Sequence, residues 1–207
     1  RSVYAESSED ELLEMMNYIK KRKNEEMMGG TMNHGKRENK NLARQAATYL
    51  RKSDGPRVAV FEVNGFDTHA AQGGVDGSHT KSLVEMDEII NNLKDNLQEA
   101  YKDTIILTVT EFGRTIKQNG GNGTEHGYGT AIFMAGGLLK KSQVYTDWPG
   151  LKKKEMYEGR DLNATIDARS VYASAMSTVF DLDFKRIQKD VFWGEDLQNL
   201  SDKLFKA

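Results

Sequence analysis

Apolar residues recur at helix spacing in four stretches of the chain, and this pattern predicts four helices. They cover about residues 12–19, 41–50, 82–101 and 168–180. Ser7 or Ser8 followed by Glu11 is typical of an N-cap for the first helix. Residues 28–35 contain three glycines and are expected to form a loop. The longest apolar stripe, in residues 82–101, indicates the strongest helix.

Three short runs rich in β-branched residues predict buried strands at 58–63, 104–110 and 131–135. A strand, a long helix and a strand in this order form a crossover unit, which is expected to be parallel and right-handed. The sequence therefore predicts an α/β fold with a mainly parallel sheet flanked by helices. We expect a helical N-terminal segment over residues 1–55 and the α/β domain over residues 56–207.

Composition narrows the classes of partner and cofactor. The formal net charge of the 207 residues is -2, which gives no indication of a nucleic-acid partner. The chain has no cysteine, so any metal ion must be held by His, Asp, Glu or carbonyl oxygen. No apolar run approaches the roughly 20 residues that cross a bilayer, so we expect no membrane span. The chain begins with Arg1, and we expect the natural start to lie upstream.

Polar clusters follow the predicted strands. Asp67 and His69 come after the first strand, and Glu111 and Arg114 come after the second. A glycine-rich loop then brings His126 in front of the third strand. Ligands of open α/β sheets bind beside the carboxyl ends of the strands, so these side chains are expected to meet at one sheet edge.

The residue types suit a metal ion or an anion. Asp67 and His69 are two residues apart on a turn, and Zn²⁺ accepts such ligands at about 2.0–2.2 Å. Mn²⁺ or Mg²⁺ would prefer more oxygen. A dication stabilises the charge that develops during ester hydrolysis, and the planar guanidinium of Arg114 can hold an anionic oxygen pair.

Each cluster alone also has a purely structural explanation. An Asp-x-His turn is often a capped loop, and Glu111 can pair with Arg114. The glycines of the 119–127 loop are also typical of a flexible connection, and His126 alone is typical of a surface histidine. In this interpretation the polar turns only brace the sheet.

Taken together, the motifs resemble the bacterial family called domain of unknown function 1501. The resemblance covers about residues 56–193 and rests on a fixed order of motifs. These are Asp67-Thr68-His69 with Gln72, Glu111-Phe112-Gly113-Arg114, Gly123-Thr124-Glu125-His126-Gly127, Gly136-Gly137 and residues 161–173.

Members of this family resemble sulfatases and the wider alkaline phosphatase superfamily. The resemblance implies that residues 56–207 are the C-terminal part of a sulfatase-like α/β domain. It also implies a divalent metal ion (zinc, manganese or calcium), a small anionic ester substrate, and export to the periplasm or cell exterior. The implied metal ligands are Asp67, His69, Glu111 and His126. The implied catalytic residues are Glu111 and Arg114, and Arg114 and Thr68 would bind substrate.

The sequence departs from the family and superfamily patterns at two positions. Glu125 replaces the family's Asp, and Glu111-Phe112 replaces an Asp-His pair, which removes one nitrogen ligand. The superfamily's nucleophile is not found in this chain. Two functions therefore remain open: a metal-dependent hydrolase of phosphate or sulfate esters, and a non-catalytic exported binding or scaffold protein that keeps the fold.

Overall fold

The computed structural model describes residues 33–206, with side chains from residue 39 onward. The helix expected over residues 12–19, its cap and the glycines at 29 and 30 lie outside this range. The described chain forms two compact units. The first consists of residues 33–63 and Glu85–Gln98, and the second of Asn64–Val84 and residues 99–206. The division expected between residues 55 and 56 stays a prediction.

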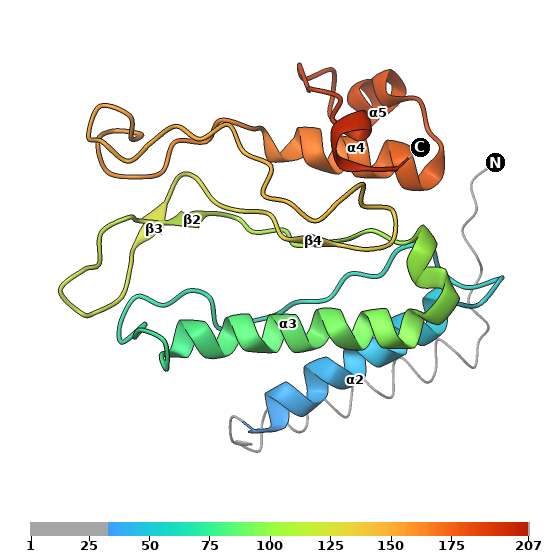
Figure 1. Ribbon diagram of the computed structural model, residues 1–207, viewed down its shortest axis with the longest axis horizontal. Coiled ribbons are helices and arrows are strands. Elements are labelled where there is room, and N and C mark those ends of the chain that lie inside the picture. Colours follow the sequence, from blue (N-terminus) through green and yellow to red (C-terminus); the bar gives the residue numbers. More distant parts are fainter. Residues whose placement is uncertain (1–32, 207) are drawn as a thin grey trace. The chain divides into compact units, whose positions relative to one another are not determined.

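The first unit is a pair of helices, α2 (Asn33–Leu50) and the greater part of α3 (Ser78–Leu97) (Figure 1). Both helices were predicted, but α2 begins at Asn33, within the expected loop. Asn39 donates to Glu85 and Lys40 pairs with Glu88, so the two helices run in the same direction. The buried apolar residues of the two helices are small in α2 and larger in α3: Ala43 and Ala47, and Ile89, Leu93 and Leu97.

Residues 58–63 are not the buried strand that the apolar run predicted. No strand is assigned to them, and the side chains of Val58 and Val60 are 62% and 90% exposed. A run of β-branched residues favours an extended backbone, but a strand also needs a neighbouring strand to pair with. No described residue supplies that partner here.

The second unit contains two short antiparallel sheets. Strand β1 (Ile106–Leu107) pairs with β4 (Met134–Ala135), and β2 (Gly113–Arg114) pairs with β3 (His126–Gly127). All four strands lie on one long ribbon that runs out to the loop at residues 116–124 and back (Figure 1). Thr108 and Thr115 hydroxyls accept backbone N–H groups of the opposite arm, at 2.9 and 3.1 Å. These side-chain bonds interrupt the regular ladder and keep the strands short.

The expected mainly parallel sheet flanked by helices is therefore wrong. Parallel neighbours need a crossover of a dozen or more residues, usually a helix. Between β2 and β3 the chain has a glycine-rich turn, so it folds straight back and the two arms pair antiparallel. The sheets of the described residues are these two antiparallel pairs.

Three helices close the second unit: α4 (Ala168–Phe180), α5 (Phe184–Asp190) and α6 (Ser201–Leu204). The bounds of α4 are those predicted. It begins where the carboxylate of Asp167 accepts the N–H of Arg169, and it ends at Asp181 in the left-handed conformation. The α4 residues Val171 and Ala175 pack against Leu200, Leu204 and Phe205 to form the main core.

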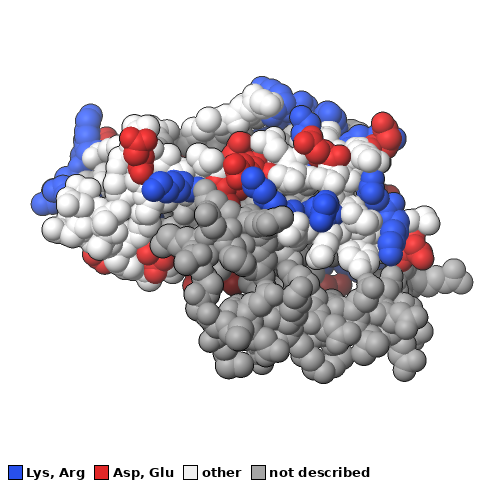
Figure 2. Space-filling model, turned by 90° about the horizontal axis from the view of Figure 1, so that it is seen from below, with Lys and Arg blue, Asp and Glu red and all other residues white. Residues whose placement is uncertain are grey.

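No helix among the described residues has the length and apolar character needed to cross a membrane. Basic and acidic side chains are interspersed on the coloured part of the face in Figure 2. This mixture agrees with a net charge close to zero.

Candidate metal centre

Three polar segments of the second unit meet at one point. Asp67 and His69 lie on the turn after residue 63, and His126 is the first residue of β3. The pairing of β2 with β3 places Arg114 directly opposite His126. Asp67, His69 and His126 each present one potential ligand atom, and these atoms lie within 4.8 Å of one another.

Backbone hydrogen bonds tie the Asp67–Gln72 turn to the glycine-rich loop. The N–H groups of Ala71 and Gln72 donate to the carbonyls of Gly121 and Asn122, each at 2.8 Å. In return, the N–H of Thr124 donates to the carbonyl of Thr68 at 3.0 Å. A side chain at Gly123 would overlap the backbone of His69, so the two segments can approach this closely only with glycine there. The loop is therefore part of the site.

The three donor atoms form a nearly equilateral triangle. Asp67 Oδ1 lies 3.0 Å from His69 Nε2 and 3.2 Å from His126 Nε2. The two imidazole Nε2 atoms are 3.2 Å apart. Ligands about 2.0–2.1 Å from a tetrahedral Zn²⁺ are separated by about 3.3 Å. The spacing of the donors therefore fits a small divalent ion.

The charge distribution also favours a cation between these atoms. A carboxylate oxygen only accepts hydrogen bonds, and an unprotonated imidazole nitrogen also presents a lone pair. Partial desolvation raises the pKa of Asp67, but the Arg114 hydrogen bond and the charges of His69 and His126 lower it more, so the pKa ends below 3.8. Asp67 is thus ionised at neutral pH and suits a positive ion, which is either a metal or a proton on an imidazole.

Arg114 braces the cluster from the side. Its guanidinium donates to Asp67 Oδ1, to the carbonyl of Thr124 and to Thr124 Oγ1. Two of its five N–H groups make no hydrogen bond to a described residue, so the predicted binding of a substrate anion by Arg114 stays a prediction. The hydroxyl of Thr68 donates to Gln72 Oε1 at 2.8 Å, and its predicted role in substrate binding also stays a prediction.

Glu125 and Asn119 complete the hydrogen-bond network, and neither was predicted as a site residue. Glu125 Oε2 lies 2.8 Å from His69 Nδ1, and Asn119 Nδ2 donates to Glu125 Oε1. Hydrogen bonds from Asn119 and then from His69 lower the pKa of Glu125 below its ordinary value of 4.5. A loop Asn that precedes two glycines is the one sequence signal that could have pointed to this arrangement.

Glu111 lies apart from the other predicted ligands. It is exposed and is not one of the three residues whose ligand atoms converge. Its neighbour Phe112 stacks on the ring of His126, with centroids 3.7 Å apart and planes inclined by 15°. The predicted ligand and catalytic roles of Glu111 therefore have no geometric support in this arrangement.

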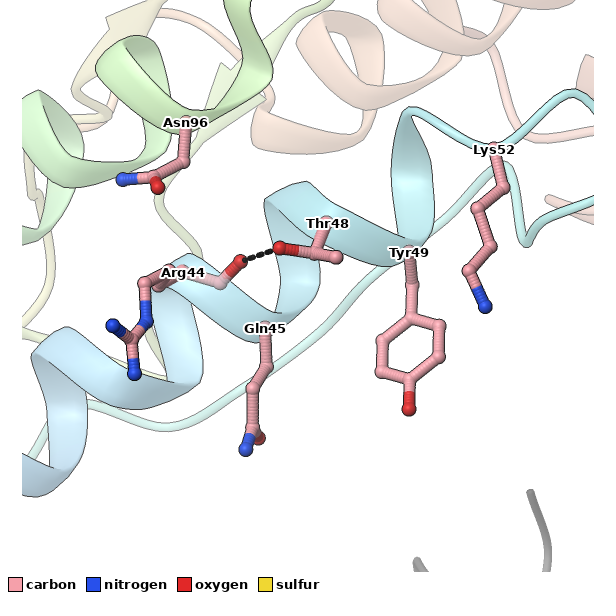
Figure 3. Close-up of a pocket in the computed structure, with 6 residues that line it drawn as sticks. All are labelled: Arg44, Gln45, Thr48, Tyr49, Lys52 and Asn96. Carbon is pink, nitrogen blue, oxygen red and sulfur yellow. Dashed lines mark hydrogen bonds between the residues drawn. The ribbon is translucent and has the colours of Figure 1, made fainter. Parts of the chain in front are cut away.

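Two other features remain separate from the cluster. A hollow of about 280 Å³ in the first unit is lined by Arg44, Gln45, Thr48, Tyr49, Lys52 and Asn96 (Figure 3). It contains no carboxylate and no histidine. His79, at the start of α3, packs edge-on against Phe66 and presents no ligand atom to the three-residue cluster.

The order of these motifs agrees with a comparison of the sequence with known families. The family described as "Protein of unknown function (DUF1501)" matches residues 5–189. The chain belongs to this family. The resemblance expected from the motifs is confirmed at this level, and the match extends further towards the N-terminus than expected. No curated protein matches the chain, and no solved structure does.

Proposed function

We propose that Asp67, His69 and His126 hold a divalent metal ion, and that the intact protein uses this centre to hydrolyse phosphate or sulfate esters. The triangle formed by Asp67 Oδ1 and the two Nε2 atoms is the observation that carries the proposal. Three protein ligands with space for a further one are typical of catalytic rather than structural metal sites. A bound ion would supply Lewis acidity to an anionic ester.

The donor set narrows the choice of ion. Two imidazole nitrogens and one carboxylate suit Zn²⁺, whereas Ca²⁺ takes six to eight oxygen ligands at longer distances. Mn²⁺ fits if water completes its coordination. The ligand side chains are 45–53% exposed, so water and a small substrate can reach them. We therefore propose zinc or manganese and no longer favour calcium.

The residues of the chain have separate roles in this proposal. Arg114 holds the carboxylate of Asp67 in place and keeps two N–H groups for an anionic oxygen of the substrate. Phe112 orients the ring of His126 by stacking. The sulfatase-like assignment, export from the cytoplasm and the choice of a phosphate or sulfate ester rest on the resemblance of the motifs alone.

A substrate screen of the intact, metal-loaded protein tests the hydrolase. We expect turnover of a phosphate or sulfate ester that needs zinc or manganese. Asp67→Asn and His126→Ala should abolish this turnover, because the first removes the negative charge of the carboxylate and the second removes an imidazole nitrogen. Asp76→Asn removes an exposed carboxylate outside the cluster and should leave it unchanged. Turnover that survives Asp67→Asn would contradict the proposal.

A non-catalytic exported binding or scaffold protein is the second candidate. The engagement of Arg114 by Asp67 and Thr124 favours it, because three of the guanidinium N–H groups are already used within the protein. In this case the protein binds metal but turns over no ester in the screen. If it binds no metal either, the polar network only braces the loops, and Asp67→Ala then lowers stability by leaving the hydrogen-bond partners of Asp67 unsatisfied.

A further inference from the structure

Glu125 and Asn119 form a hydrogen-bonded chain behind His69. Asn119 Nδ2 donates to Glu125 Oε1 at 2.5 Å, and Glu125 Oε2 lies 2.8 Å from His69 Nδ1. We propose that Glu125 and Asn119 are positioning residues that fix the tautomer and the ring orientation of His69, and so set the metal affinity of the site. This inference rests on the proposed metal-binding function of His69 Nε2.

The tautomer of His69 follows from the chemistry of its partner. An ionised carboxylate only accepts hydrogen bonds, so His69 Nδ1 must carry the hydrogen. In the neutral ring Nε2 then carries the lone pair, and this atom lies 3.0 Å from Asp67 Oδ1 and 3.2 Å from His126 Nε2. A metal-ligating histidine is commonly held in this way, with its second nitrogen bound to a carboxylate.

The orientation of Asn119 is fixed by the loop itself. Its Oδ1 accepts the N–H groups of Gly121 and Gly123, both at 2.9 Å. The oxygen therefore faces the loop, and Nδ2 must face outward. That nitrogen donates both to Glu125 and to the carbonyl of His69, at 2.7 Å for the latter. The glycine-rich loop thereby determines where the Glu125 carboxylate lies.

The two imidazoles of the cluster are held by different means. His69 is oriented by the Glu125 carboxylate, whereas His126 is stacked on the ring of Phe112. No described carboxylate other than Asp67 contacts His126, and that contact is made by Nε2. Removing Glu125 should therefore change the tautomer of His69.

Nitrogen NMR of the neutral imidazoles in the full, metal-free chain at alkaline pH tests this directly. In the unchanged protein we expect His69 in the Nδ1–H form. Glu125→Ala should give His69 a mixture of tautomers and lower zinc affinity about 10–100-fold. Glu125→Gln leaves one acceptor oxygen for two donors, Asn119 Nδ2 and His69 Nδ1, so it should also weaken the Nδ1–H form and lower zinc affinity. Glu99→Ala removes an exposed carboxylate of a 3-10 helix outside the cluster and should change neither quantity.

The variant Asn119→Asp tests the role of Asn119 separately from that of Glu125. It keeps the oxygen that accepts the two glycine N–H groups but replaces the Nδ2 donor, so Glu125 loses its support. We expect a loss of zinc affinity smaller than that of Glu125→Ala. An affinity equal to that of the unchanged protein would overturn the role of Asn119.

The outcomes distinguish this inference from the proposed function. If the unchanged protein binds no zinc, the proposed function fails and this inference fails with it. If it binds zinc, but Glu125→Ala alters neither the His69 tautomer nor the affinity, only the positioning role is overturned.

Discussion

The C-terminal helices and the cluster of Asp67, His69 and His126 belong to the same unit but are held together by different interactions. In the helical region Leu200 and Phe205 are almost fully buried, at 0% and 2% exposure. Even the polar Ser174 is buried there, where it accepts the N–H of Leu200 at 2.8 Å and donates to Ser170. In the cluster, by contrast, the ligand side chains are about half exposed and are held by Arg114, Glu125 and Asn119.

This contrast separates the sources of stability and of function. Burial of apolar surface stabilises the helical region, and substitutions there should affect folding. The cluster contributes little buried apolar surface and so adds little to stability. We therefore infer that its polar side chains are arranged to bind a ligand. Substitutions in the helical region should therefore leave zinc affinity unchanged. Substitutions in the cluster should leave the free energy of unfolding without zinc unchanged.

The largest expected effect is on folding. Phe205→Ala should lower the free energy of unfolding by about 3–5 kcal/mol, because it leaves a cavity against Val171, Leu200 and Leu204. Urea unfolding measures this loss. The protein that remains folded should bind zinc with its original affinity, and a parallel loss of affinity would show that the two regions are not independent.

The next effect concerns the cluster. Zinc at about 100 times its dissociation constant should raise the free energy of unfolding by about 2.7 kcal/mol. This increment should vanish in Asp67→Asn and persist in Phe205→Ala, as followed by thermal unfolding with and without zinc. An equal zinc effect in Asp67→Asn would place the bound ion elsewhere.

The smallest effect is the pH dependence of the α4 cap. Hydrogen bonds from Arg169 lower the pKa of Asp167 below its ordinary value of 3.8, so folding favours the ionised carboxylate. The stability that this charge adds is therefore present above pH 3.8 and is lost as the pH falls through the lower pKa of the folded state. Asp167→Asn keeps a cap oxygen but removes the charge.

Unfolding of the two proteins at neutral pH and near pH 3 measures this contribution. The pair is partly exposed, so we expect Asp167→Asn to be less stable by under about 1 kcal/mol at neutral pH. The difference should shrink near pH 3. A difference that grows on acidification would contradict the role of the ionised carboxylate.

The sequence predicted those elements that depend on local pattern. The spacing of apolar residues located helices α2, α3 and α4. The cap at Asp167 agrees with the predicted start of α4. The prediction of the strands was wrong about which strands pair with each other. An apolar run such as residues 58–63 favours an extended backbone, but its partner is a non-local property that periodicity does not carry.

The predicted meeting of Asp67, His69 and His126 was reached through a sheet that does not exist in the described chain. They come together because β2 and β3 pair with Arg114 opposite His126, and because Gly123 lets its loop lie against His69. Motif order gave the participants. Motif order could not predict the antiparallel turn. This turn places Glu125 against His69, whereas Glu111 lies outside the cluster.

X-ray absorption at the zinc edge of the zinc-loaded protein tests the metal centre most directly. We predict two imidazole nitrogens and at least one oxygen at about 2.0–2.2 Å from the ion, and one imidazole fewer in His126→Ala. A spectrum without imidazole scattering, or one that is the same in His126→Ala, would contradict a metal site at Asp67, His69 and His126.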